Sequence, residues 1–172
     1  MKKIILVGYM GSGKTTIGKL LAEKTEIPFF DLDAIIEKNT QKTISQLFTD
    51  EGEIKFRKLE HQTLKTFLEK HETFVLSLGG GTPCYANNHE VLLPGNVFSF
   101  YLKASIKKIV ERVASEKKHR PLLANKSDAE LEDFIAKHLF ERSYFYHQAK
   151  VVIDVDDKSP QVITEEIITS LT

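Results

Sequence analysis

The chain has 172 residues, a length that fits one domain and lets roughly 70% of the unfolded chain's surface be buried. Its 24 lysines and arginines balance 24 aspartates and glutamates, so no overall field favours nucleic acid or an anionic membrane as a partner. Cys84 is the only cysteine, which excludes an internal disulfide and a cysteine-based zinc site.

The first apolar run of the chain begins at Ile4 and stops at Gly8. This run is too short for the apolar core of a signal peptide, and no later run approaches the length that spans a membrane. We therefore expect a cytoplasmic protein without a membrane partner, and the neutral charge predicts no nucleic-acid partner. We also expect a monomer.

Residues 8–15 read GYMGSGKT and match the phosphate-loop pattern G-x-x-x-x-G-K-[ST] at every constrained position. A β-branched apolar run at Lys3–Val7 predicts a buried strand before the loop, and apolar residues at helical spacing predict a helix over 15–26. A glycine-rich turn with a chance lysine is the alternative. The strand, loop and helix context favours a nucleotide site, with candidate residues Gly11, Ser12, Gly13, Lys14, Thr15 and Thr16.

Each residue type in this loop has a physical role. Glycines allow backbone conformations that point successive N–H groups at phosphate oxygens, and the N-terminus of the following helix favours the same anion. Lys14 adds a positive charge, and the hydroxyl of Thr15 is placed to ligate the magnesium of a nucleotide.

The rest of the chain alternates predicted strands and helices. Strands are predicted at 28–31, 74–78, 97–102 and 151–155. Helices are predicted at 34–39, 43–71 with a break near Gly52, 105–113, 128–149 and from Pro160 onward. This alternation predicts an α/β fold with a parallel sheet covered on both faces. Its active rim, at the carboxyl ends of the strands, would carry the phosphate loop, Asp31 and residues 79–81.

The sequence argues against two other classes of phosphate-loop protein. Residues 125–128 read NKSD and fit the guanine-reading motif of GTPases, but a proline-interrupted segment precedes them instead of a strand, and the D-x-x-G motif is absent. We interpret Asp128 as the N-cap of the next helix. The length and the neutral charge disfavour a nucleic-acid motor.

A small-molecule kinase needs a partner for magnesium, an acceptor site and a cation over the phosphates. Asp31 and Asp33 close the second strand, where alternation would point both carboxylates toward the phosphates; alternatively, they are only the acidic start of the next helix. Arg57 and Glu60 share a helix face, so the glutamate can orient the guanidinium or form a plain surface ion pair. The unpatterned segment 114–127, which contains Arg120, suggests a mobile lid or a solvated charge run.

The ordered set of motifs resembles the shikimate kinase family over nearly the whole chain. The motifs are GYMGSGKTT, DLD, FRKLE, SLGGG, RPLL and ERSYFY. The resemblance implies a P-loop fold of the nucleoside-monophosphate-kinase type, with a five-stranded parallel sheet. It also implies phosphorylation of the 3-hydroxyl of shikimate by ATP with Mg²⁺. The family usually has proline two residues after its late arginine, where this chain has Tyr144.

The same resemblance assigns roles to individual residues. Asp33 would hold and deprotonate the acceptor hydroxyl, and Glu60 would orient Arg57. Lys14 and Arg120 would stabilise the transferred phosphoryl group. Thr15 and, through water, Asp31 would hold magnesium, and Arg112 would pack on adenine. The implied shikimate-binding residues are Asp33, Arg57, Gly79, Gly80, Gly81 and Arg142. Two alternatives remain, a gluconate-type sugar-acid kinase and a nucleotide-binding switch without a small acceptor.

Overall fold

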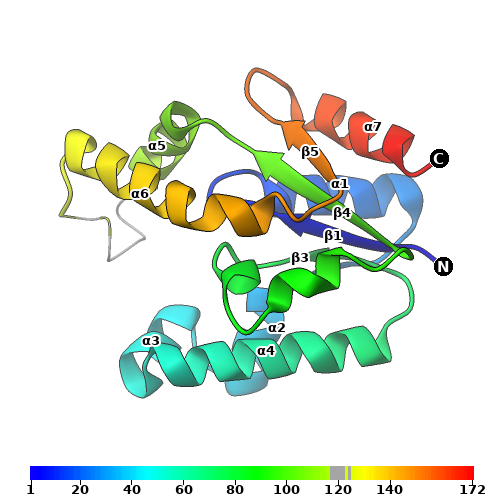
Figure 1. Ribbon diagram of the computed structural model, residues 1–172, viewed down its shortest axis with the longest axis horizontal. Coiled ribbons are helices and arrows are strands. Elements are labelled where there is room, and N and C mark those ends of the chain that lie inside the picture. Colours follow the sequence, from blue (N-terminus) through cyan, green and yellow to red (C-terminus); the bar gives the residue numbers. More distant parts are fainter. Residues whose placement is uncertain (117–122, 124) are drawn as a thin grey trace.

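The computed structural model describes residues 1–116, 123 and 125–172 (Figure 1). Five parallel strands form one sheet in the order β2-β3-β1-β4-β5, which confirms the predicted α/β architecture. The strands are β1 Lys3–Val7, β2 Phe29–Asp31, β3 Phe74–Ser77, β4 Val97–Lys103 and β5 Val151–Asp154. Each lies within two residues of its predicted range.

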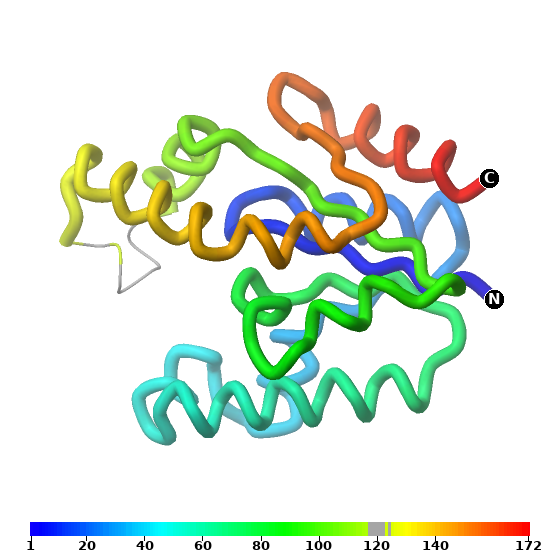
Figure 2. Tube along the Cα trace, viewed as in Figure 1, coloured from blue at the N-terminus to red at the C-terminus, as the bar shows by residue number. Residues whose placement is uncertain are grey.

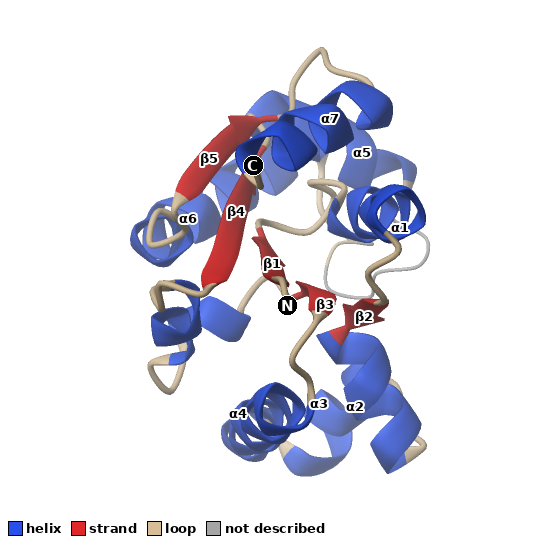
Figure 3. Ribbon diagram, turned by 90° about the vertical axis from the view of Figure 1, so that its right-hand side faces the viewer, coloured by secondary structure: helices blue, strands red, loops and turns tan. Residues whose placement is uncertain are grey.

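Helices cover both faces of this sheet. Figure 3 shows α1 and α7 on one face and α4 and α6 on the other. The α-helices are α1 Lys14–Thr25, α2 Leu32–Thr40, α3 Ile44–Glu51, α4 Glu53–Lys70, α5 Ile106–Ser115, α6 Asp128–Tyr146 and α7 Pro160–Ser170. The two ends of the chain meet at one side of the molecule (Figure 2), where Lys2 Nζ donates to the Leu171 carbonyl oxygen at 3.4 Å.

The core is centred on β1. Ile4, Ile5, Leu6 and Val7 have no exposed surface, as expected of a parallel strand that is covered on both faces. The registers pair Leu6 with Ser77 on β3 on one side and with Phe100 on β4 on the other. These registers bring the carboxyl ends of the three central strands to one rim, where the phosphate loop begins.

Hydroxyl side chains begin several of the helices. Thr43 and Ser127 form capping boxes at α3 and α6, and Ser105 and Ser159 accept hydrogen bonds from backbone amides at the starts of α5 and α7. The predicted N-cap at Asp128 is therefore wrong by one residue. Ser127 has the extended backbone and the side-chain bond of a cap, and Asp128 is the first helical residue, where its charge favours the helix dipole.

Two further features were not predicted. Two short 3-10 helices, η1 Thr82–Cys84 and η2 Asn88–Leu92, fill the connection between β3 and β4. Gly18 on α1 packs so closely on β2 that a side chain there would collide with the Phe29 ring. The missing side chain thus lets α1 lie directly on the strand. Within the described ranges, every helix is too short or too polar to cross a membrane.

Candidate functional site

The phosphate loop connects β1 to α1 in the conformation that its glycines allow. Gly11 and Gly13 have positive φ angles of 77° and 97°, which disfavour any residue with a side chain. A Cβ on Gly8 would lie 2.7 Å from the Leu102 carbonyl oxygen. Ser12 is buried, and its hydroxyl has no hydrogen-bond partner among the described residues. The loop therefore keeps a buried polar group available to a ligand.

Lys14 is folded back onto this loop. Its Nζ donates to the carbonyl oxygens of Gly8 at 2.7 Å and Tyr9 at 3.1 Å. The ammonium group therefore lies beside the loop backbone, at the start of α1, where the helix N-terminus also attracts anions. Thr15 and Thr16 follow on the exposed first turn of α1, as predicted.

Thr15 and Asp31 meet across the α1 and β2 junction. Thr15 Oγ1 donates to Asp31 Oδ2 at 3.4 Å, and Asp31 Oδ1 accepts from the Ala34 backbone amide at 3.1 Å. Asp31 is thus the N-cap of α2 as well as a neighbour of Thr15. The helix-start interpretation of Asp31 is therefore confirmed, and its role at magnesium stays a prediction.

Asp33 lies on a helix and not at the end of a strand as predicted. Strand β2 ends at Asp31, so Asp33 lies in the first turn of α2, and strand alternation does not orient it. Its carboxylate faces Gly79. Burial, followed by the charges of Asp31 and Glu60, raises its pKa to about 6, despite the opposing effect of Lys14. A carboxyl group with such a pKa can accept a proton near neutral pH.

Three glycines after β3 gather the predicted acceptor residues. A Cβ on Gly79 would lie 2.9 Å from Asp33 Oδ1, and one on Gly80 would lie 3.3 Å from Arg142 Nη1. One on Gly81 would lie 2.6 Å from Arg57 Nη2. The absence of side chains at 79–81 is therefore what lets one carboxylate and two guanidinium groups converge.

Arg57 is held by Glu60. Arg57 Nη1 donates to Glu60 Oε1 at 2.9 Å, and Glu60 has only 1% of its surface exposed. The surface ion pair that the sequence left open is therefore wrong, because the carboxylate is in the interior. A buried carboxylate that lost this arginine would be unpaired, so the pair fixes the guanidinium firmly.

A hydrogen-bond chain that the sequence did not reveal supports Glu60 from η1 and η2. Thr82 Oγ1 donates to Glu60 Oε2 at 2.8 Å, and Asn88 Nδ2 donates to the Thr82 carbonyl oxygen at 3.0 Å. Asn88 Oδ1 lies 2.6 Å from His61 Nδ1, which therefore carries the hydrogen of that bond. Thr82 thus occupies Oε2 of Glu60, while Oε1 accepts from Arg57.

Arg142, on α6, lies near Tyr9 and Tyr146. Its guanidinium carbon is 5.6 Å from the centre of the Tyr9 ring, and the Tyr146 hydroxyl donates to the Gly80 carbonyl oxygen at 2.5 Å. Burial raises the pKa of Tyr146, so this phenol stays neutral and supplies no counter-charge. In the described part of the chain, no carboxylate oxygen lies within 4.0 Å of Arg142. The site thus contains a half-buried cation that suits an anionic ligand.

The remaining two predicted arginines have different outcomes. Arg112, on α5, donates from Nη1 to the Gly11 carbonyl oxygen at 2.6 Å, so it borders the phosphate loop. Arg120 lies outside the described residues, as do 117–122 and 124 of the predicted lid. Cys84, near Arg57 and Arg142, does not take part in this chemistry. Burial raises the pKa of its thiol to about 11, so the thiol stays protonated at neutral pH.

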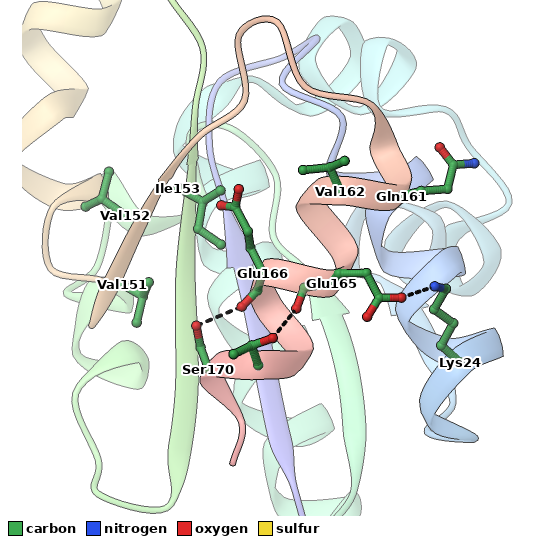
Figure 4. Close-up of a pocket in the computed structure, with 10 residues that line it drawn as sticks. Lys24, Val151, Val152, Ile153, Gln161, Val162, Glu165, Glu166 and Ser170 are labelled. Carbon is green, nitrogen blue, oxygen red and sulfur yellow. Dashed lines mark hydrogen bonds and ion pairs between the residues drawn. The ribbon is translucent and has the colours of Figure 1, made fainter.

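A separate groove of about 630 Å³ lies between β5 and α7, bordered by Lys24 at the far end of α1 (Figure 4). Figure 4 shows Lys24 paired with Glu165 across its edge. The groove contains none of the predicted site residues. Lys24 is ten residues beyond Lys14 on α1, which is roughly 15 Å along the helix. The chemistry therefore belongs at the rim and not in this groove.

Known proteins resemble this chain over nearly its full length. The shikimate kinase family model matches residues 10–172. A shikimate kinase from Flavobacterium psychrophilum is 52% identical over 97% of both chains. Among solved structures, shikimate kinase from Bacteroides thetaiotaomicron is 39% identical with a TM-score of 0.89, covering 99% of this chain and 96% of that one.

A solved shikimate kinase from Acinetobacter baumannii, in complex with shikimate, has a TM-score of 0.87 and 32% identity. The match covers 99% of this chain and 93% of that one. The similarity thus extends over the phosphate loop, α2, α4, the glycine run and α6 alike. The chain belongs to the shikimate kinase family.

Proposed function

We propose that this protein transfers the γ-phosphoryl group of ATP to the 3-hydroxyl of shikimate, giving shikimate 3-phosphate and ADP. The observation that carries the proposal is the convergence of Asp33, Arg57 and Arg142 on residues 79–81 beside the phosphate loop. Two guanidinium groups suit a planar carboxylate, and one carboxyl group suits a hydroxyl proton. A nucleotide switch without an acceptor has no use for such a set.

Each end of the reaction has its own residues. The 3-hydroxyl oxygen of shikimate forms a bond to the γ-phosphorus, the bond from that phosphorus to the β,γ-bridging oxygen breaks, and Asp33 takes the hydroxyl proton. Lys14 moves from the loop carbonyls to the phosphoryl oxygens and stabilises the charge there. Ser12 and the loop amides hold the phosphates, and Arg112 borders the nucleotide. We assign the second cation over the phosphoryl group to Arg120.

Thr15 and Asp31 are the residues that would hold Mg²⁺. Their hydroxyl and carboxylate oxygens are 3.4 Å apart, and oxygen donors of this kind suit Mg²⁺. The other ligands of the ion would come from water and from the phosphates of the nucleotide. When bound, Mg²⁺ neutralises phosphate charge.

The test is an ADP-release assay with ATP, Mg²⁺ and one acceptor at a time. Shikimate, quinate and gluconate form the acceptor series. We expect steady ADP release with shikimate and little with the other two. ADP release that does not depend on any acceptor would favour the nucleotide switch, and preference for gluconate would favour a sugar-acid kinase.

We also propose that residues 1–172 act as one kinase domain, as a cytoplasmic monomer whose segment 114–127 serves as a lid. The single sheet and its continuous core support one domain. The proposed ligands are the small molecules ATP and shikimate, with no nucleic acid and no membrane. Sedimentation of the purified protein, alone and with both ligands, would measure its oligomeric state.

A further inference from the structure

The ring of Tyr85 covers the Arg57 guanidinium. It follows η1 directly, and its ring centre lies 3.9 Å from the Arg57 guanidinium carbon, which is contact distance. Phe56 and Phe48 lie farther away, at 5.2 and 5.7 Å. Arginine groups stack favourably on aromatic faces. Tyr85 is therefore the closest of three rings around this cation.

The ring is itself held in place. Burial and a hydrogen bond to the Glu53 carboxylate raise the pKa of the Tyr85 hydroxyl, which stays protonated and donates to Glu53. Glu53 Oε1 also lies 3.6 Å from Arg57 Nε. Tyr85, Glu53 and Arg57 thus contact one another, although Tyr85 is 38% exposed and lies at the rim rather than in the core.

The edge of the guanidinium remains available. Glu60 takes one N–H of Nη1, and Nε is buried without a hydrogen-bond partner in the described part of the chain. Nη2 faces Gly81, at the glycine run where the acceptor is proposed to bind. A guanidinium donates only in its own plane, and the contacts with Tyr85 and Glu60 restrict the orientation of that plane in Arg57.

We propose that Tyr85 is a positioning residue that sets the acceptor specificity of the enzyme, by fixing the orientation in which Arg57 offers its paired donors to a carboxylate. The inference rests on the proposed function and deepens it. Without the ring, the guanidinium gains freedom to rotate and its face meets water, which weakens its bonds to a carboxylate. A neutral acceptor makes no such bonds and is little affected. Tyr85 therefore separates acids from uncharged analogues.

The experiment compares the parent with Tyr85→Leu, Tyr85→Phe and the control Tyr144→Leu. Tyr144 is an exposed tyrosine on α6 without contact to Arg57 in the described structure. For each protein, kcat/KM is measured with shikimate and with shikimate methyl ester, together with KM for ATP, the Kd for shikimate by calorimetry, and the thermal unfolding temperature.

We expect Tyr85→Leu to raise Kd and KM for shikimate by ~3- to 30-fold, with kcat and the KM for ATP nearly unchanged. The acid-to-ester ratio of kcat/KM should fall by a similar factor. Tyr85→Phe keeps the ring and should stay within about threefold of the parent, and Tyr144→Leu should match the parent. A general loss of folding would lower kcat/KM for both substrates by the same factor and leave the acid-to-ester ratio unchanged.

The possible failures are distinguishable. If the parent does not phosphorylate shikimate, the proposed function fails, and calorimetry still shows whether Tyr85 affects acid binding. If the parent is active and the acid-to-ester ratio of Tyr85→Leu equals that of the parent, the positioning role is wrong. A Tyr144→Leu variant with the same altered ratio would also overturn it.

Discussion

The acceptor side and the phosphate side of the site are organised in opposite ways. On the acceptor side, Arg57 is bonded to Glu60, and Thr82 holds Glu60 in turn, so the guanidinium already has its position. On the phosphate side, Lys14 is bonded to carbonyl oxygens of its own loop. The acceptor side is therefore preorganised. On the phosphate side, Lys14 must exchange its hydrogen bonds to the loop for bonds to the ligand. We expect substitutions on the two sides to affect different constants.

Asp33 lies between the two sides, and its loss should have the largest effect. Asp33→Asn removes the proton acceptor and should lower kcat by ~10²- to 10⁴-fold, the usual contribution of a general base. The Kd for ATP should change little. Single-turnover kinetics with saturating shikimate measure this, and a kcat near that of the parent would remove Asp33 from the mechanism.

The same variant should be more stable than the parent. The pKa of Asp33 is raised to about 6 in the folded protein, so the folded state binds its proton more tightly than the unfolded state. Stability from this group is present below about pH 4, near the unfolded pKa, and is lost as the pH rises through about 6. The neutral amide of Asp33→Asn escapes that loss, so denaturant unfolding without ligands at about pH 8 should show a gain of about 1 to 3 kcal/mol. If the difference in stability between variant and parent were the same at low and high pH, the burial argument would be contradicted.

Lys14→Ala tests the phosphate side. Removing a group that stabilises developing charge should lower kcat by at least ~10²-fold. Since Lys14 is bonded to its own loop, whereas Arg57 is bonded to Glu60, the Kd for shikimate should stay near the parent value. The exposed Lys19, one turn further along α1, provides the matched control as Lys19→Ala. Activity of Lys14→Ala within a few-fold of the parent would contradict the assignment.

Arg142→Lys tests the acceptor side. Arg142 is the less constrained of its two arginines, because no carboxylate of the described residues is paired with it, whereas Arg57 is bonded to Glu60. Lysine keeps the charge but loses the planar pair of donors, so shikimate binding should weaken by ~1.5 to 3 kcal/mol. Arg57→Lys should act similarly. The ester should bind the variants and the parent about equally, which calorimetry can measure. If the parent handles ester and acid alike, the two arginines do not recognise a carboxylate.

Thr82→Val should give the smallest effect. It tests whether the hydrogen bond from Thr82 to Glu60 contributes to shikimate binding. The substitution removes the bond to Glu60 Oε2 and leaves a buried carboxylate oxygen without its donor. We expect KM for shikimate to rise by ~3- to 10-fold, and Thr82→Ser to restore it. Unchanged KM in the valine variant would show that Arg57 alone keeps Glu60 in place.

The sequence was sufficient for whatever depends on local pattern. Apolar runs and helical spacing located the strands and most helix boundaries, and the glycine pattern located the phosphate loop. The placement of Arg57 beside Glu60 also followed from helical spacing. Roles of individual residues came from the family resemblance and remain predictions.

Contacts between distant segments were not predictable in this way. Thr82 and Glu60 are 22 residues apart, and Tyr146 and Gly80 are 66 apart, so no local periodicity connects them. The 3-10 helices that carry Thr82 and Asn88 are too short to show a period. Their positions depend on packing against α4, which the residues of either segment alone do not determine.

Because Gly18 has no side chain, the backbone of α1 lies directly against the Phe29 side chain of β2. Thr15 is one helical turn before Gly18, and Asp31 is two residues after Phe29. The contact of Gly18 with Phe29 and that of Thr15 with Asp31 therefore both lie along the interface of α1 and β2. The separation allowed at the glycine therefore sets the 3.4 Å separation of the two oxygens nearer the phosphates. A methyl group at Gly18 would push Phe29 away and widen the separation of Thr15 from Asp31. We therefore expect Gly18→Ala to weaken the proposed Mg²⁺ site, although Gly18 bears no ligand atom.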